Sequence, residues 1–133
     1  MNYVDTFIEI ADDCPVQAAV VPAFKGGKKT IPVLQYEIIA KHPYQYTQED
    51  VLFEAYAEHN QIPATHRPTE RQKFFAKEQP CLRSSALGKR YGWGIHSDAN
   101  GKVALYARES TDYQRLASDP TLKHLKALRS KRS

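Results

Sequence analysis

The feature that most restricts the fold is a pair of β-prone segments on either side of Asn100-Gly101. Residues 91–97 (YGWGIHS) and 102–107 (KVALYA) are rich in aromatic and aliphatic side chains. Asn-Gly is typical of a tight hairpin turn, because both residues tolerate a positive φ angle. We therefore predict an antiparallel β-hairpin from about residues 91–97 and 102–107.

The number of turn residues decides which side chains share a face of this hairpin. With two or four residues in the loop, one face carries the rings and the other carries the glycines. The predicted aromatic face holds Tyr91, Trp93, Ile95, Ala104 and Tyr106. The predicted aliphatic face holds Gly92, Gly94, His96, Val103, Leu105 and Ala107. The aromatic face is either covered by helices as part of the core, or open as a platform on which a base or sugar can stack.

Periodicity and capping residues predict the remaining elements. A β-prone run predicts a strand over residues 6–11, and helical spacing predicts a helix over residues 30–41. Thr47 and Asp50 form a relative of the capping box, which opens a second helix that ends near Asn60. Three further helices are expected over residues 69–77, over residues 110–117, and from Pro120 through Leu122, Leu125 and Leu128.

Together these elements predict a small α+β fold, in a single domain that spans residues 1–133. Its small antiparallel sheet joins the hairpin to the N-terminal strand, and several short helices pack against that sheet. A chain of 133 residues with 41% hydrophobic residues is long enough to bury a core of its own. The sequence has neither an internal repeat nor a boundary between domains.

Charge is distributed unevenly along the chain. Residues 1–60 contain 4 Lys/Arg and 9 Asp/Glu, whereas residues 61–133 contain 15 and 6, so the net charges are −5 and +9. A basic C-terminal half favours a polyanion, a phosphate-bearing ligand or an acidic partner. The alternative is that the acidic and basic parts fold onto each other, so that their fields partly cancel.

The segment between Gln79 and Tyr106 concentrates the side chains that an anionic, ring-bearing ligand requires. Cationic groups bind phosphates, hydroxyls and backbone N–H groups line anion-binding loops, and aromatic rings stack on bases. We therefore predict a binding module for an anionic small molecule or a nucleic acid. The expected ligand-binding residues are Arg83, Ser84, Ser85, Lys89, Arg90, Tyr91, Trp93 and His96.

Two other functions stay open. A cofactor-independent enzyme would use Cys81 as its nucleophile and His96 as the base, although a phosphatase loop would need arginine where Leu87 stands. A protein-interaction domain would use the acidic and basic surfaces to assemble copies or recruit partners. No metal or other cofactor is expected, because the cysteines and histidines lack the spacing of metal ligands.

The N-terminus and the cysteine content indicate the compartment. Residues 1–14 have neither the basic start nor the apolar run of a secretory signal, and no segment is apolar enough to span a membrane. Cys14 and Cys81 are the two cysteines of the chain, too few for a disulfide framework. We therefore expect a cytoplasmic protein without a membrane partner.

Four segments of the sequence are distinctive: residues 3–8 (YVDTFI), 42–44 (HPY), 79–83 (QPCLR) and 87–96 (LGKRYGWGIH). Together they resemble a family of short bacterial and fungal proteins, which is known as a domain of unknown function. The likeness extends over nearly the whole chain, and the last two segments are its specific part. The resemblance implies a stand-alone cytoplasmic domain and supplies no activity, substrate, cofactor or site residue.

Overall fold

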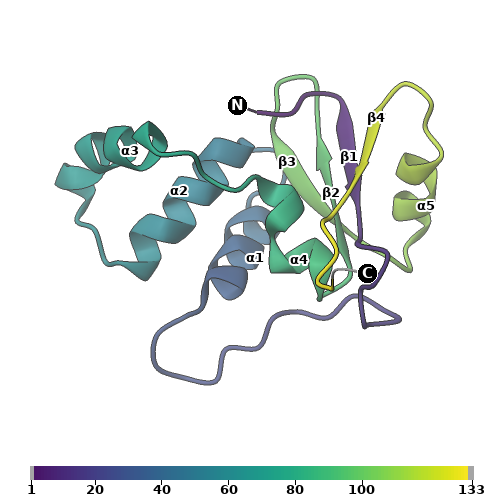
Figure 1. Ribbon diagram of the computed structural model, residues 1–133, viewed down its shortest axis with the longest axis horizontal. Helices are drawn as coiled ribbons and strands as arrows, with labels where there is room; N and C mark the ends of the chain where they lie inside the picture. The colour runs from purple at the N-terminus through teal and green to yellow at the C-terminus, as the bar shows by residue number, and fades with distance from the viewer. Residues whose placement is uncertain (1, 132–133) are drawn as a thin grey trace.

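The structure is a computed structural model that describes residues 2–131, and it has an α+β fold built on one mixed sheet (Figure 1). The strands are β1 (Thr6–Glu9), β2 (Trp93–Ser97), β3 (Val103–Ala107) and β4 (Lys123–Lys126). The α-helices are α1 (Ile31–Lys41), α2 (Gln48–His59), α3 (Arg67–Ala76), α4 (Ala86–Lys89) and α5 (Thr111–Ala117). Two 3₁₀ turns, η1 (Ala64–His66) and η2 (Leu82–Ser84), precede α3 and α4.

Local capping explains where several of these elements begin. At the start of α2, the Thr47 side chain accepts the Asp50 N–H and the Asp50 carboxylate accepts the Thr47 N–H, so the predicted capping box is confirmed. The Ser110 side chain accepts the Tyr113 N–H and opens α5 as predicted. The helices predicted over residues 30–41 and 69–77 are confirmed as α1 and α3, with small shifts of their ends.

The hairpin is confirmed, but its predicted pairing of side chains is wrong. Trp93 pairs with Ala107 and Ser97 with Val103, so an odd number of residues separates the strands. Gly101 has a φ of +77°, and its N–H donates to the Asp98 carbonyl. This geometry belongs to a type I turn that is followed by a left-handed glycine and a bulge. Trp93 therefore lies on one face of the sheet, and Tyr106 on the other.

The C-terminal segment also departs from the prediction, because residues 123–126 form a strand and not a helix. β4 runs parallel to β1 in a sheet of order β3-β2-β1-β4, so the sheet is mixed and not purely antiparallel. The leucine spacing that suggests a helix is accidental. Leu125 packs against the core, Leu122 packs beneath α5, and Leu128 is exposed.

Helices cover both faces of the sheet, and α5 stands apart from the others in Figure 1. On one face, Ile8, Ile95 and Val103 pack with side chains of α1, α2 and α4. On the other face, Phe7 packs with Tyr113 and Leu116 from α5 and its neighbours. α3 lies outermost and contains no buried residue. No helix within residues 2–131 is both long and apolar enough to cross a bilayer.

Candidate functional site

Residues 79–86 lie beside α1 and α2, where hydrogen bonds to buried polar side chains of both helices hold them in place. The Leu82 N–H donates to the Gln48 side-chain oxygen, at 2.8 Å. The Ser85 hydroxyl accepts the Leu87 N–H, which caps α4, and donates to Gln35 Oε1 at 2.6 Å. Because each of these partners lies on a helix, the segment has a defined position beside α1 and α2.

A cavity of about 400 Å³ lies between this segment, α1, α2 and α3. Ile31 and Gln35 face it from one turn of α1, and Leu52 and Tyr56 face it from one turn of α2, since residues four apart share a helix face. The other lining residues are Pro32, Phe74, Gln79, Pro80, Cys81, Ser84, Ser85 and Ala86. None of the described residues that line the cavity is charged.

Two polar groups at the cavity have hydrogen-bonding capacity to spare. Gln35 is only 5% exposed, and its one side-chain hydrogen bond among residues 2–131 is the contact of Oε1 with Ser85. The amide Nε2 group, which belongs to a residue of the cavity wall, has no protein partner within that range and is accessible to water or a ligand, so it is an unused donor in this sense. The Ser84 hydroxyl, in the same wall, has no protein partner within that range either.

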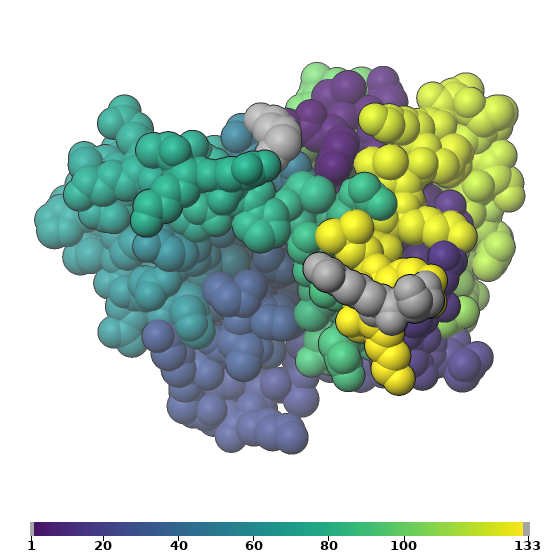
Figure 2. Space-filling model, in the orientation of Figure 1, coloured from purple at the N-terminus to yellow at the C-terminus, as the bar shows by residue number. Residues whose placement is uncertain are grey.

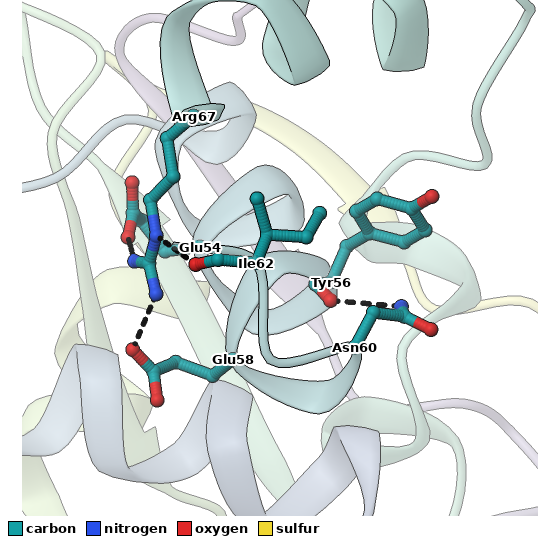
Figure 3. A network of polar contacts seen from close by, with 6 residues as sticks. All are labelled: Glu54, Tyr56, Glu58, Asn60, Ile62 and Arg67. Atoms are coloured by element: carbon teal, nitrogen blue, oxygen red, sulfur yellow. Dashed lines mark hydrogen bonds and ion pairs between the residues drawn. The ribbon is translucent and has the colours of Figure 1, made fainter. Parts of the chain in front are cut away.

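Ion pairs and a hydrogen bond of Arg67 attach α3, which forms one wall of the cavity, to α2 and the chain after it (Figure 3). The Arg67 guanidinium contacts Glu54 at 2.8 Å and Glu58 at 2.9 Å, and its Nε donates to the Ile62 carbonyl. Further along α3, the Phe74 ring lies 4.6 Å from the Tyr56 ring, centroid to centroid. Arg67 thus fixes one end of α3, and the ring contact fixes the side that faces the cavity.

The structure does not bring the predicted ligand-binding residues together at one point. Ser84 and Ser85 lie at the cavity, but Arg83 turns away and its Nε donates to the Lys126 carbonyl at the end of β4. The Trp93 indole packs on Tyr36 and donates to the Val20 carbonyl, so it is not an open platform. Lys89, Arg90 and Tyr91 lie at the end of α4 and the start of the hairpin, and His96 lies on the α5 face.

Cys81 and His96 do not form the expected pair within residues 2–131. Cys81 lines the cavity beside α1 and α2, and its Sγ accepts a hydrogen bond from the Tyr3 hydroxyl at 3.5 Å. His96 lies in register with Phe7 on the opposite face, and its Nδ1 is 2.7 Å from the Tyr44 hydroxyl. Because the sheet separates the two side chains, His96 is not placed to act as a base for Cys81.

His96 instead belongs to a small hydrogen-bonded cluster with Tyr44 and Tyr106. The two phenol oxygens are 2.6 Å apart, and residues 44–46 are held beside β3 by backbone hydrogen bonds to Val103. Burial raises the pKa of the Tyr44 phenol well above its ordinary value. Burial also lowers the pKa of the His96 imidazole, which favours the neutral ring as a partner of Tyr44.

This shift predicts how acid affects folding. The unfolded chain takes up a proton on His96 near pH 6.5, whereas the folded chain binds it at lower pH, so lowering the pH from 7.5 to 5.5 reduces the free energy of unfolding. We expect the reduction to be smaller in His96→Gln, which can still accept the Tyr44 hydroxyl. Urea unfolding of both proteins at the two pH values measures this difference. Equal pH dependence would contradict it.

Cations gather elsewhere, at the C-terminal end of the described chain. A groove of about 640 Å³ is lined by Asp12, Arg83, Lys126, Ala127, Leu128, Arg129 and Lys131. In Figure 2 the C-terminal segment, in yellow, lies next to the N-terminal segment, in purple. Lys126 forms an ion pair with Asp12 at 2.8 Å, and the Asp13 carboxylate accepts the Lys131 N–H. The acidic and basic parts therefore do fold onto each other at this groove.

Sequence reasoning missed the cavity residues that come from α1, α2 and α3. One signal was available: Gln35 stands within the apolar stripe of its helix, between Leu34 and Ile38, where a polar side chain needs an explanation. Tyr56 and Phe74 gave no such signal, because aromatic side chains at helical spacing are equally typical of a core.

Comparison with known proteins yields a family and no relative of known activity. The model of a family of unknown function, DUF6157, matches residues 1–133. No curated protein and no solved structure shows significant similarity to the chain.

Proposed function

Because the chain belongs to DUF6157, a family of unknown function, its own geometry has to suggest the activity, and we propose that it binds a neutral, ring-bearing small molecule. The binding site is the cavity between α1, α2, α3 and residues 79–86. One observation carries this proposal: the unused amide donor of the buried Gln35 in the wall of a largely apolar cavity.

The cavity suits a small molecule in size and lining. Ligand sites in proteins usually have volumes of about 300–1,000 Å³, with apolar walls and a few convergent polar groups. The Tyr56 and Phe74 rings and the Ile31 side chain offer apolar contact area for a flat ring. The Gln35 amide and the Ser84 hydroxyl can then fix one polar end of the ligand, which gives the site its selectivity.

The charge of the ligand follows from the charge of the walls. A carboxylate or phosphate buried here would lose its hydration without gaining a cationic partner, at a cost of several kcal/mol. A neutral acceptor such as an amide carbonyl avoids this cost and accepts the Gln35 N–H. The proposed ligand is therefore neutral, in contrast to the anion that the sequence of residues 83–96 suggests.

A bulkier side chain in the cavity should abolish binding. We expect neutral aromatic amides and imides to raise the melting temperature of the wild type, since a ligand at a hundredfold over its Kd adds about 2.7 kcal/mol of stability. Ala86→Phe places a ring in the cavity and should remove the shift, whereas Ala40→Phe, on the exposed side of α1, should keep it. A shift of equal size in Ala86→Phe would contradict the proposed site.

A second candidate is an anionic ligand at the groove of Arg83, Lys126, Arg129 and Lys131. The observation in its favour is this convergence of cations from η2 and the chain after β4. Against it, Asp12 also lines the groove and already pairs with Lys126. A phosphate-bearing ligand would have to compete with that carboxylate, so this site ranks second.

Salt dependence tests the second candidate. If a short oligonucleotide binds the groove, its affinity should fall steeply between about 50 and 200 mM salt, because each neutralised phosphate releases counterions. Lys131→Glu should weaken this binding, and Lys41→Glu, on α1, should leave it unchanged. Fluorescence anisotropy of a labelled oligonucleotide measures both effects. An affinity that does not change with salt, or no binding, would rule out this candidate.

A further inference from the structure

We propose that Cys81 captures the ligand of this cavity covalently, and that the ligand is a neutral, ring-bearing α,β-unsaturated carbonyl compound. This inference rests on the proposed function, since it names the chemical class of the molecule that the cavity binds. It joins three features: a half-buried cysteine in the cavity wall, a phenol hydrogen-bonded to its thiol, and the Gln35 amide donor of the same wall.

The first step is the placement of the thiol. Cys81 lines the cavity from the start of η2, and its Sγ accepts the Tyr3 hydroxyl at 3.5 Å. The hydrogen bond to Cys81, together with burial, raises the pKa of the Tyr3 phenol, so that it stays protonated and continues to donate. The same hydrogen bond fixes the position of the Sγ atom of this wall residue.

The second step is the placement of the carbonyl group. When a thiolate adds to the β-carbon of an unsaturated carbonyl compound, negative charge develops on the carbonyl oxygen. A fixed N–H donor near that oxygen stabilises the charge. The Gln35 Nε2 group is such a donor, because Gln35 is held by its own bond to Ser85 and lines the same cavity as Cys81. The apolar walls strengthen this interaction by lowering the local dielectric.

The reaction balances without another reactant. Cys81 releases its proton to water, the S–C bond forms at the β-carbon, and the electrons of the C=C π bond move to the carbonyl oxygen as an enolate. The α-carbon then takes up one proton from water and the C=O bond is restored. The net change is the addition of S–H across C=C, in which no external oxidant or reductant takes part.

Cys14 provides a control within the same chain. It too is a free, half-buried thiol, and it packs against the core cluster that contains Ile8 and Ile95, but it does not line the cavity. General thiol reactivity would therefore modify both cysteines to similar extents. Capture by the cavity would favour Cys81 alone, and only for reagents that fit between the apolar walls.

The experiment compares two maleimides with the same reactive group, neutral N-phenylmaleimide and anionic maleimidoacetic acid. We expect N-phenylmaleimide to modify Cys81 at least about tenfold faster than Cys14, equivalent to 1.4 kcal/mol of preference, with a rate that saturates as the reagent concentration rises. Maleimidoacetic acid should show no such preference. Peptide mass spectrometry after timed quenching gives the rate at each cysteine.

Matched variants test the assigned roles. Two variants, Tyr3→Phe and Gln35→Glu, should each slow the modification of Cys81 by N-phenylmaleimide and leave the rate at Cys14 unchanged. Glutamate at position 35 keeps an acceptor for the Ser85 hydroxyl. N-Phenylsuccinimide, which has the same shape without the C=C bond, reports reversible binding alone. If it stabilises the wild type but Cys81 shows no preference or saturation, covalent capture is wrong and the binding function stands. If it does not bind and Cys81 shows no preference, both proposals fall.

Discussion

Phe7→Ala is expected to lower the free energy of unfolding by about 4 kcal/mol, as in other truncations of fully buried aromatic residues. Phe7 is 0% exposed and lies at the centre of β1, an interior strand of the sheet. Its ring meets the Tyr113 ring edge-on, at 5.0 Å between centroids, and Leu116 belongs to the same cluster. Removing the ring leaves a cavity between the sheet and α5. Urea unfolding monitored by circular dichroism measures the resulting loss in the free energy of unfolding.

Phe24→Ala is the matched control for this prediction. Phe24 is 51% exposed in the long segment before α1, so the same substitution should change stability by less than about 0.5 kcal/mol. Similar losses in both variants would mean that α5 does not pack on Phe7 as described. That result would contradict the second layer of the fold.

Gly94→Ala is expected to cost about 3 kcal/mol, because a methyl group at this position overpacks the same layer. A Cβ atom on Gly94 would lie 2.6 Å from a ring carbon of Phe7 and 2.6 Å from one of Tyr113. Neither ring can withdraw easily, since Phe7 is buried beneath α5 and Tyr113, on α5, is buried against the sheet. Chemical unfolding of the variant measures the cost.

A double-mutant cycle tests the cause of this loss. Leucine at position 7 lacks the ring atoms that the new Cβ would meet, so Gly94→Ala should cost less in a Phe7→Leu background than in the wild type. The expected coupling is about 1 kcal/mol or more, because the two residues are in direct contact. Strictly additive losses would show that the strain arises somewhere else.

Local signals predicted the elements that depend on neighbouring residues. Thr47 and Asp50 cap α2 as their spacing indicates, and the Asn-Gly pair marks the hairpin. The register of the hairpin was not predictable from that pair, because Asn-Gly occurs in more than one kind of turn. Here the Asp98 carboxylate accepts the N–H groups of Asn100 and Lys102 and stabilises the longer turn. One extra turn residue moves Tyr106 to the other face.

Elements that depend on distant residues were harder to predict. Residues 123–126 become a strand because β1 offers a free edge 117 residues earlier, where the Asp5 carbonyl accepts the Lys123 N–H. Nothing in the leucine spacing reveals this partner. The mixed sheet therefore follows from long-range pairing, which single-sequence periodicity does not contain.

The candidate site was predictable in part for the same reason. Cys81, Ser84 and Ser85 are among the functional residues that the sequence predicts, and they line the cavity. The other walls come from three helices between residues 31 and 76, which only the tertiary fold brings to this segment. Residues beyond 90 were grouped with them because they are near in sequence. A strand directs alternate side chains to opposite faces, so Trp93 and His96 point away from each other.

An NMR titration of the ¹⁵N-labelled protein with benzamide, a neutral ring that bears a carbonyl acceptor, tests whether the cavity beside Gln35 binds a ligand. If benzamide binds in the cavity, the Gln35 side-chain NH₂ signals and the backbone amides of Ser84 and Ala86 should shift together and saturate. Shifts confined to residues 126–131, or no saturable shift at all, would contradict the claim that the cavity beside Gln35 is the binding site.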